Sequence, residues 1–260
     1  MAEYTTLYHL AHYYDVAFRR DVSDQIAFFC TLFERHTGRP LRSLLDIACG
    51  PGYHAITAAE MGMRGVGLDL MPEMIEYASA HTPPGIDVEW IAADMREFEL
   101  SAPVDMAISL FDSIDALNEN ADVIKHFHSV AANLNPGGLF LIQHTHPRDC
   151  NLVYYPRFHY GGERDGIRVE VEWATNSPTF DLVAEVAHVD IELHVYENGS
   201  EQVIYDSAVE RIFSPQEFQL LADASGRFDV VDWLGSFNVN QPFDLSPLSE
   251  TMILVMQRKG

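Results

Sequence analysis

The chain has 260 residues, of which 47% are hydrophobic and 21% charged, so it holds enough apolar material for the core of one globular domain with an elaboration. Its formal net charge is −23 at pH 7, and Lys125 and Lys259 are its only lysines; we therefore expect no nucleic acid and no membrane as a partner, because both need clustered cations. The three cysteines are too scattered for a disulfide framework, and Met1-Ala2-Glu3-Tyr4 shows no signal region, so we expect a cytoplasmic protein.

The first elements are predicted helices. Residues 5–37 read as one or two helices, the second of which ends at Gly38. The buried side of this second helix is predicted from the helical spacing of Ile26, Phe29, Cys30 and Phe33. The stretch 12–18 ahead of it is unusually aromatic and contains Tyr14. Two interpretations stand for this stretch: it packs against the core as a leading helix, or it closes over a bound ligand.

A strand, a glycine turn and a helix follow over residues 43–61. Residues 43–47 form an apolar run typical of a strand buried on both faces, and the run breaks at Gly50-Pro51-Gly52. Glycines at such a turn let the backbone approach a ligand closely, and the N–H groups of the following helix point at it. The pattern therefore predicts a cradle for an anionic or zwitterionic cofactor.

The core then alternates strand and helix. Strands are predicted at 64–70, 88–92, 105–111 and 139–143, with helical patterns between them. The helix before the fifth strand is expected to stop at Pro136-Gly137-Gly138. Such alternation implies a parallel sheet with helices on both faces.

Residues 150–211 break this alternation. Ile167, Val169, Val171 and Trp173 alternate with charged residues, a second alternating run follows, and Asn198-Gly199 is a hairpin signal. We predict an antiparallel sheet inserted after the fifth strand. Because its apolar faces need burial, we expect this sheet to cover the acceptor side of the site and to form a possible homodimer interface.

The core is predicted to resume after the insertion. Ser214-Pro215-Gln216-Glu217 is a capping box, and the last two strands are predicted at 228–233 and 252–256. The predicted domain organisation is a core of residues 1–149 and 212–260 and an inserted sheet of residues 150–211.

Four motifs, in their usual order, resemble those of the class I S-adenosylmethionine-dependent methyltransferases. They are Leu45-Asp46-Ile47-Ala48-Cys49-Gly50-Pro51-Gly52, Gly67-Leu68-Asp69-Leu70, Ala93-Asp94-Met95 and Leu134-Asn135-Pro136-Gly137-Gly138. The resemblance implies a Rossmann-like α/β fold with a seven-stranded, mostly parallel sheet and an antiparallel sheet inserted after the fifth strand. It also implies S-adenosyl-L-methionine as the cofactor.

The sequence looks closest to the amino-sugar N,N-dimethyltransferases of macrolide biosynthesis. The similar stretches are Gly52-Tyr53-His54, Asp94-Met95-Arg96-Glu97-Phe98 and Phe111-Asp112-Ser113-Ile114-Asp115. This likeness implies methyl transfer to a small-molecule acceptor, and it favours nitrogen over oxygen as the methylated atom. The alternatives are an NAD(P)-dependent oxidoreductase, which the looser fingerprint Gly50-x-Gly52-x-x-Ala55 permits, and a non-catalytic S-adenosylmethionine-binding module.

The resemblance also implies where the cofactor is bound. Asp69 is placed to accept hydrogen bonds from the ribose hydroxyls, Asp94 to bind the adenine amino group, and Leu70 and Met71 to sandwich the adenine. Asp46 is expected to have a structural-electrostatic role near the turn. The full predicted set is Asp46, Ala48, Gly50, Gly52, Asp69, Leu70, Met71, Asp94, Met95 and Leu110.

Acceptor and catalytic residues are expected beyond the fourth and fifth strands, because ligands of open α/β sheets lie at the carboxyl ends of the strands. The predicted acceptor-binding residues are Phe111, Asp112, Ser113, Arg148 and Arg157. The predicted catalytic residues are His144, His146 and Tyr14. Three interpretations stand for each histidine: it contacts the acceptor or acts as the base, it binds a metal, or it is a polar loop residue without a role in catalysis.

The run His188, Asp190, Glu192 and His194 is likewise either a set of metal ligands or the polar outer face of the inserted sheet. We predict no metal site.

Overall fold

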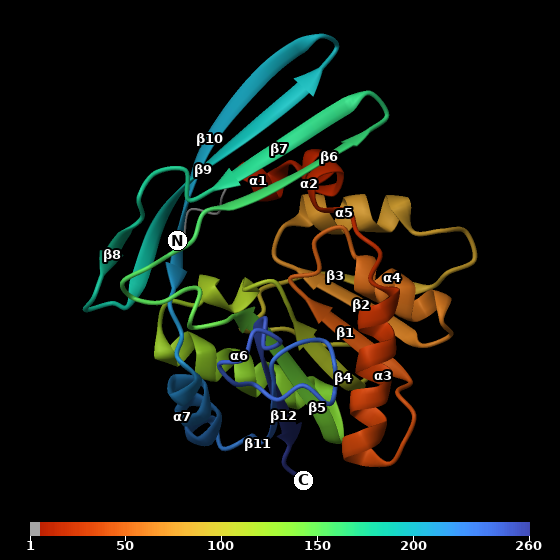
Figure 1. Ribbon diagram of the computed structural model, residues 1–260. Helices are drawn as coiled ribbons and strands as arrows, with labels where there is room; N and C mark the ends of the chain where they lie inside the picture. The colour runs from red at the N-terminus through yellow and green to blue at the C-terminus, as the bar shows by residue number, and fades with distance from the viewer. Residues whose placement is uncertain (1–5) are drawn as a thin grey trace.

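The computed structural model describes residues 6–260, so residues 1–5, which include the N-terminal tetrapeptide and the start of the first predicted helix, lie outside it. Two sheets stand apart, the larger in the core and the smaller above it, with the N-terminal helices between them (Figure 1). Within residues 6–260, no helix is long and apolar enough to cross a membrane.

The core sheet has seven strands in the order β11-β12-β5-β4-β1-β2-β3. Neighbouring strands from β1 to β5 pair in parallel, whereas β12 is antiparallel to both β5 and β11. This arrangement confirms the predicted seven-stranded, mostly parallel sheet. The strands are β1 (Ser43–Ile47), β2 (Arg64–Asp69), β3 (Val88–Ala92), β4 (Val104–Ser109), β5 (Leu134–Thr145), β11 (Phe228–Leu234) and β12 (Thr251–Arg258).

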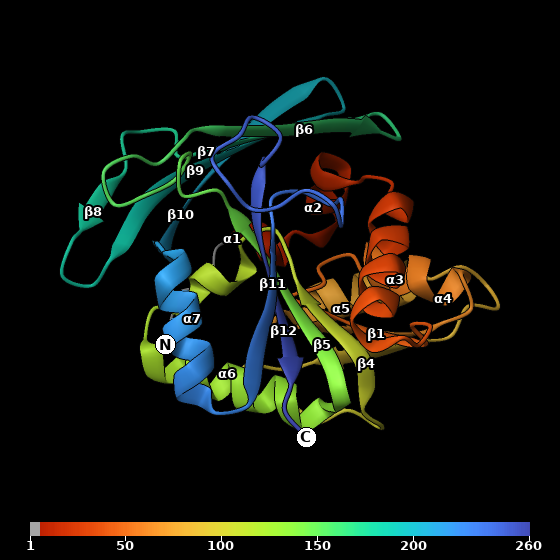
Figure 2. The ribbon, with the colours of Figure 1, turned by 60° about the horizontal axis from the view of Figure 1, so that its bottom comes forward.

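Helices cover both faces of this sheet, as Figure 2 shows. One apolar cluster joins α6 and α7 to the sheet through Phe127 and Phe218, and another joins α3 and α4 to the opposite face through Phe29 and Ala58. The capping box at Ser214 begins α7 as predicted. The helices are α3 (Ser23–Thr37), α4 (Tyr53–Glu60), α5 (Pro72–His81), α6 (Asn120–Asn133), α7 (Pro215–Ser225) and the short η1 (Ser113–Ala116).

The fifth strand starts earlier than predicted. β5 begins at Leu134, which pairs with Val104, and the pairing with β4 then shifts register before it resumes at Leu139. Pro136 and Gly137 occupy this irregular part, where a missing N–H and a positive φ cost no ladder hydrogen bond. The Pro-Gly-Gly signal therefore marks a kink at the start of the strand and not the end of the helix, which stops at Asn133.

The second sheet is antiparallel, has five strands and follows the fifth core strand, which confirms the predicted insertion. Asn198 and Gly199 both have positive φ and join its two longest strands, as the hairpin signal indicates. The strands are β6 (Phe158–Arg164), β7 (Ile167–Trp173), β8 (Thr179–Asp181), β9 (Val186–Glu197) and β10 (Ser200–Arg211).

Two short helices, α1 (Thr6–His9) and α2 (Ala11–Phe18), lie under this sheet (Figure 1). Val16 and Phe18 share a buried cluster with the apolar face of β7 and β9. The approach is so close that a Cβ on Gly162 would stand 2.0 Å from the carbonyl oxygen of Val16. The apolar face of the sheet is therefore buried within the chain, which removes the reason given above for a homodimer.

Candidate functional site

The turn between β1 and α4 has the backbone shape that the sequence predicts. Ala48, Gly50 and Gly52 all have positive φ, and Gly52 is the N-cap of α4. A Cβ on Gly52 would stand 2.1 Å from the Trp90 ring, so this position requires glycine for packing as well as for its backbone conformation. The turn opens at the carboxyl end of the strands and presents the first N–H groups of α4.

Asp69 ties this turn to the end of β2. Its Oδ2 accepts the Gly50 N–H at 2.8 Å, and its Oδ1 accepts the Met71 N–H at 2.9 Å. Burial raises the pKa of this carboxyl, and the two N–H donors oppose the rise. Because each carboxylate oxygen has two acceptor positions, one on each remains for a ribose hydroxyl.

Asp46, in β1 next to the turn, has one buried carboxylate oxygen that lacks a hydrogen-bond donor among the described residues. Its Oδ2 makes no hydrogen bond within residues 6–260, and the Nδ1 of His54 lies 3.5 Å away. A buried carboxylate oxygen without a donor is costly, so the position favours a bound cation such as an α-ammonium group. Asp46 and Asp69 thus fit the methionine and ribose parts of S-adenosylmethionine.

The predicted adenine-binding residues follow β2 and β3. Leu70 and Met71 pack against Tyr14 in a small cluster between α2 and α5. Asp94 forms a close ion pair with Arg96, which lowers the pKa of its carboxyl. The Met95 carbonyl accepts from His126, whose pKa burial lowers to about 4. These residues reach the same edge of the sheet as the glycine turn.

The turn after β4 has a strained backbone that hydrogen bonds to Thr145 hold in place. Phe111 and Asp112 both have φ +57°, a conformation that side-chain-bearing residues rarely adopt. Asp112 holds it by accepting the Thr145 N–H at 2.5 Å and the Thr145 hydroxyl at 2.9 Å. Leu110 is buried behind the turn, and the Ser113 hydroxyl donates to the Leu110 carbonyl, so Ser113 shapes the backbone there.

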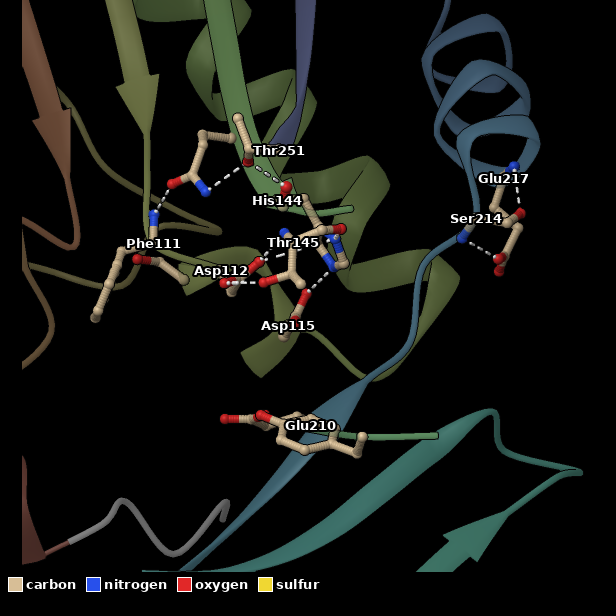
Figure 3. A network of polar contacts seen from close by, with 12 residues as sticks. Phe111, Asp112, Asp115, His144, Thr145, Glu210, Ser214, Glu217 and Thr251 are labelled. Atoms are coloured by element: carbon tan, nitrogen blue, oxygen red, sulfur yellow. Dashed lines mark hydrogen bonds and ion pairs between the residues drawn. The ribbon is translucent and has the colours of Figure 1, made fainter. Parts of the chain in front are cut away.

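His144 lies buried beneath this turn, between Asp112 and Asp115 (Figure 3). Its Nε2 is 2.9 Å from Asp115 Oδ1, and its Nδ1 is 2.8 Å from the carbonyl of Thr145. Burial alone lowers the pKa of this histidine, but Asp115 and Asp112 outweigh burial and raise it to about 10. Burial raises the pKa of Asp115 to about 6. At neutral pH the pair is therefore an imidazolium and a carboxylate.

Asp112, Asp115 and His144 bring one ligand atom each within 4.8 Å of one another, which is the spacing of a metal site. The imidazolium ring of His144 already lies between the two carboxylates, with Nε2 2.9 Å from Asp115 and Nδ1 3.8 Å from Asp112. The positive charge of His144 therefore offsets part of the negative charge of Asp112 and Asp115.

The ring of His146 is also buried and fully bonded. Its Nε2 donates to the Asp244 carbonyl at 2.9 Å, and its Nδ1 accepts the Arg148 N–H at 3.0 Å. Neither predicted catalytic histidine has a ring nitrogen free to take a proton from an acceptor. His144 and His146 are brought together at the end of β5, but in structural positions.

Tyr14 reaches the glycine turn from α2. A Cβ on Gly50 would stand 3.6 Å from the Tyr14 ring, and burial raises the pKa of its hydroxyl to about 12. The Tyr14 ring stacks on Phe18 with 4.4 Å between ring centroids. The Phe18 centroid lies 5.9 Å from that of Phe111 and 4.8 Å from that of Tyr160. This aromatic cluster joins α2, the turn after β4 and β6 around one region.

Asp15, the neighbour of Tyr14, was not among the predicted site residues. Its carboxylate has no exposed surface and accepts the hydroxyls of Tyr53 and Tyr77 at 2.7 and 2.8 Å. It also pairs with Arg19 at 2.9 Å and Arg164 at 2.6 Å. Asp15 thus fixes α2 to α4, α5 and β6, and so holds Tyr14 over the glycine turn.

The two arginines predicted to bind the acceptor are already engaged at the surface. Arg148 pairs with Asp149 and donates to the Ser249 carbonyl, and Arg157 donates to the Thr175 carbonyl. Arg20, which was not predicted, lies 5.0 Å over the Phe111 ring. In the inserted antiparallel sheet, His194 forms ion pairs with Glu192 and Glu201.

Glu210 was also missed, although it lies below Asp112 and Asp115 on β10 (Figure 3). It accepts the Tyr155 hydroxyl, which in turn accepts from Trp173 Nε1 at 3.1 Å. The sequence carries no signal for this position, because the exposed face of β10 includes the apolar residues Tyr205 and Val209 and the partly buried face includes Glu210.

Comparison with known proteins identifies the central part of the chain. A family model described as "Methyltransferase domain" matches residues 44–138. Over these residues the chain is therefore similar to methyltransferases. A putative methyltransferase of Bacillus subtilis is 34% identical over 99 residues, which make up 38% of this chain and 40% of that protein. The dTDP-3-amino-3,4,6-trideoxy-alpha-D-glucopyranose N,N-dimethyltransferase of Streptomyces venezuelae is 31% identical over 101 residues, 39% of this chain and 41% of that protein. The chain thus matches less than half the length of either relative.

Solved structures match the methyltransferase domain together with its insertion. An S-adenosylmethionine-dependent methyltransferase from Clostridium acetobutylicum has a TM-score of 0.76 at 18% identity, over 96% of this chain and 98% of that one. The amino pentose methyltransferase CalS10 from Micromonospora echinaspora, with S-adenosylmethionine bound, has a TM-score of 0.69 at 21% identity, over 92% of each chain. The predicted fold and the resemblance to S-adenosylmethionine-dependent methyltransferases are confirmed.

Proposed function

We propose that the chain transfers a methyl group from S-adenosylmethionine to a nitrogen of a small-molecule acceptor. The observation that carries this proposal is the pairing of Asp69 with the glycine turn, beside the unpartnered oxygen of Asp46. Together they offer a hydroxyl-binding carboxylate and an ammonium-binding carboxylate at one edge of the sheet.

The strand order weighs against the oxidoreductase alternative. The classic dinucleotide-binding sheet places its sixth strand next to the fifth, whereas here the last strand, β12, lies between β5 and β11 and runs antiparallel to both. No side-chain contact in the described part of the chain favours a nicotinamide over an adenosyl group.

The cofactor supplies an activated methyl group on a sulfonium, so the protein mainly orients the acceptor and excludes water. Tyr14, Phe18, Phe111 and Tyr160 form an apolar wall near the carboxyl end of β4. Asp15 keeps that wall in place through its bonds to three other elements.

The nitrogen preference draws its support from the charges near this wall. Asp112, Asp115 and Glu210 bring three carboxyl groups together there, of which Glu210 is fully ionised only above its raised pKa of about 8, whereas Arg148 and Arg157 are bonded elsewhere. Such a field suits an amine better than a phosphate or carboxylate acceptor. The homodimer and the cytoplasmic location stay predictions, and the mass of the protein in solution tests the homodimer.

Thermal-shift measurements test the cofactor part of the proposal. S-adenosylhomocysteine should raise the melting temperature, since a ligand at about 100 times its dissociation constant stabilises the fold by about 2.7 kcal/mol. NAD and NADP should not. Transfer of a labelled methyl group into an amine of a metabolite extract separates an enzyme from a binding module, and label in hydroxyl products alone would contradict the nitrogen assignment.

A further inference from the structure

Glu210 has one oxygen held in place and one left open. Trp173 Nε1–H can only donate, so the Tyr155 oxygen must accept it and the Tyr155 proton must point at Glu210 Oε2. The second oxygen, Oε1, has no hydrogen-bond partner within residues 6–260 and is not sealed from solvent. The carboxyl is thus oriented by its neighbours and keeps one oxygen for a ligand.

The groups around Glu210 make an electronegative and aromatic environment. Asp115 and Asp112 face it from the turn after β4, His144 from β5, and Tyr155 from the segment after β5. The negative charge of ionised Glu210 raises the pKa values of Tyr8, Cys150 and Tyr160. The His144 imidazolium lies 2.9 Å from Asp115 and 3.8 Å from Asp112 and offsets part of their charge, whereas no cation pairs with Glu210 in the described part of the chain.

Tyr160 connects this environment to the predicted methyl donor. Its hydroxyl lies within the electrostatic reach of Asp112, Tyr14 and Glu210 together, and its ring contacts Phe18 and Phe111. Glu210 therefore borders the same region as Tyr14, which covers the glycine turn. A group bound at Glu210 Oε1 faces the wall where the acceptor of the proposed reaction must lie.

We propose that Glu210 binds the ammonium group of the acceptor and takes its proton, so that the substrate is a small amine that arrives as a cation. This inference rests on the proposed methyltransferase function and names its substrate class and its proton acceptor. The aromatic rings of Tyr155 and Tyr160 add attraction for a cation.

The step balances without another reactant. The N–H bond of the ammonium breaks, and its proton moves to Glu210 Oε1. The freed lone pair forms the bond to the methyl carbon while the electrons of the carbon–sulfur bond return to sulfur. Burial and the nearby Asp115 charge raise the pKa of Glu210 to about 8. The carboxylate that takes this proton is therefore fully formed only above about pH 8, and it holds the proton far better than an ordinary carboxylate.

The test uses the full chain, the variant Glu210→Gln, and Glu201→Gln as a matched control on the exposed part of the same strand. Calorimetry first measures S-adenosylhomocysteine binding, which all three proteins should share. Each protein, saturated with S-adenosylhomocysteine, is then titrated at about pH 8.5, above the pKa of Glu210, with benzylammonium chloride and with benzyl alcohol. These probes have the same ring and differ in the charged group.

The parent and Glu201→Gln should bind benzylammonium about 10- to 100-fold more tightly than benzyl alcohol, and Glu210→Gln should lose this preference. Absence of the preference in the parent, or its survival in Glu210→Gln, overturns the role of Glu210 while leaving the cofactor assignment intact. Absence of S-adenosylhomocysteine binding in the parent overturns the proposed function, and this inference with it.

Discussion

Nε2 of His144 lies 2.9 Å from Oδ1 of Asp115, and both side chains are buried where β5 meets the turn after β4. The pair is a structural ion pair, because the other nitrogen of the ring is bonded to the Thr145 carbonyl. Removing one partner of a buried ion pair leaves an uncompensated charge. His144→Gln should therefore lower the free energy of unfolding by about 3–5 kcal/mol, measured by urea denaturation at pH 7.

The pH dependence of this pair has a definite sign. The folded pKa of His144, about 10, is above its ordinary value, so its stabilisation is fully present below about pH 6.5 and is lost as the pH rises through 10. The difference in unfolding free energy between the parent and His144→Gln should shrink over that range. An equal loss of stability in the Asp115→Asn background would show that the two side chains are not coupled.

The ionised form of Glu210, unlike the protonated form of His144, lowers the stability of the folded state. Burial raises its folded pKa to about 8, so the folded state binds its proton more tightly than the unfolded state, and stability falls as the pH rises from about 4.5 to 8. Glu210→Gln should be more stable than the parent by about 1–2 kcal/mol at pH 8 and equal to it near pH 4, a figure reduced for the partial exposure of the carboxyl. Denaturation curves at both pH values check this, and parallel curves for the two proteins would contradict it.

The cofactor half of the site was predictable from the sequence because its residues follow strand ends within short motifs. Gly50, Gly52 and Asp69 lie within one strand-turn-helix-strand unit, so their meeting follows from local structure. Glu210 was not predictable in the same way, because its partner Tyr155 is 55 residues away and the two meet only through the insertion.

The histidines show the same limit. Topology placed His144 and His146 at the correct edge of the sheet, but their state depends on Asp115 and on the Asp244 carbonyl, which lies 98 residues from His146. A base and a buried structural histidine look alike in sequence. The two strained residues after β4, Phe111 and Asp112, likewise gave no local signal, because Asp112 is held by Thr145 across the sheet.

Asp15 should control cofactor affinity without touching the cofactor. Its burial raises the pKa of the carboxyl, but the bonds from Arg19, Tyr53 and Tyr77 outweigh it and lower the pKa. Asp15→Asn leaves Arg164 without its buried partner and frees α2, so S-adenosylhomocysteine should bind about tenfold more weakly or worse. Calorimetry measures this, with the exposed Asp24→Asn in α3 as control; unchanged affinity in Asp15→Asn would show that α2 does not cover the cofactor.

Methyl transfer should not depend on a divalent cation. The His144 imidazolium already supplies a positive charge beside both Asp112 and Asp115. Dialysis against EDTA should leave both the melting temperature and the binding of S-adenosylhomocysteine unchanged. A drop in either, restored by Mg²⁺ or Mn²⁺, would show that these residues bind a metal in place of the proton.

The binding of S-adenosylhomocysteine to the parent, to Asp69→Ala and to Glu73→Ala tests the central claim most directly. Asp69 is assigned the ribose hydroxyls and also holds Gly50, whereas Glu73, two residues into α5, pairs only with the exposed His9 among the described residues. Calorimetry should show one site in the parent, unchanged affinity in Glu73→Ala, and a loss of at least about 100-fold in Asp69→Ala, since hydrogen bonds to a charged group contribute about 1.5–3 kcal/mol each. Equal affinity in all three proteins, or heat with NAD and none with S-adenosylhomocysteine, would contradict the account.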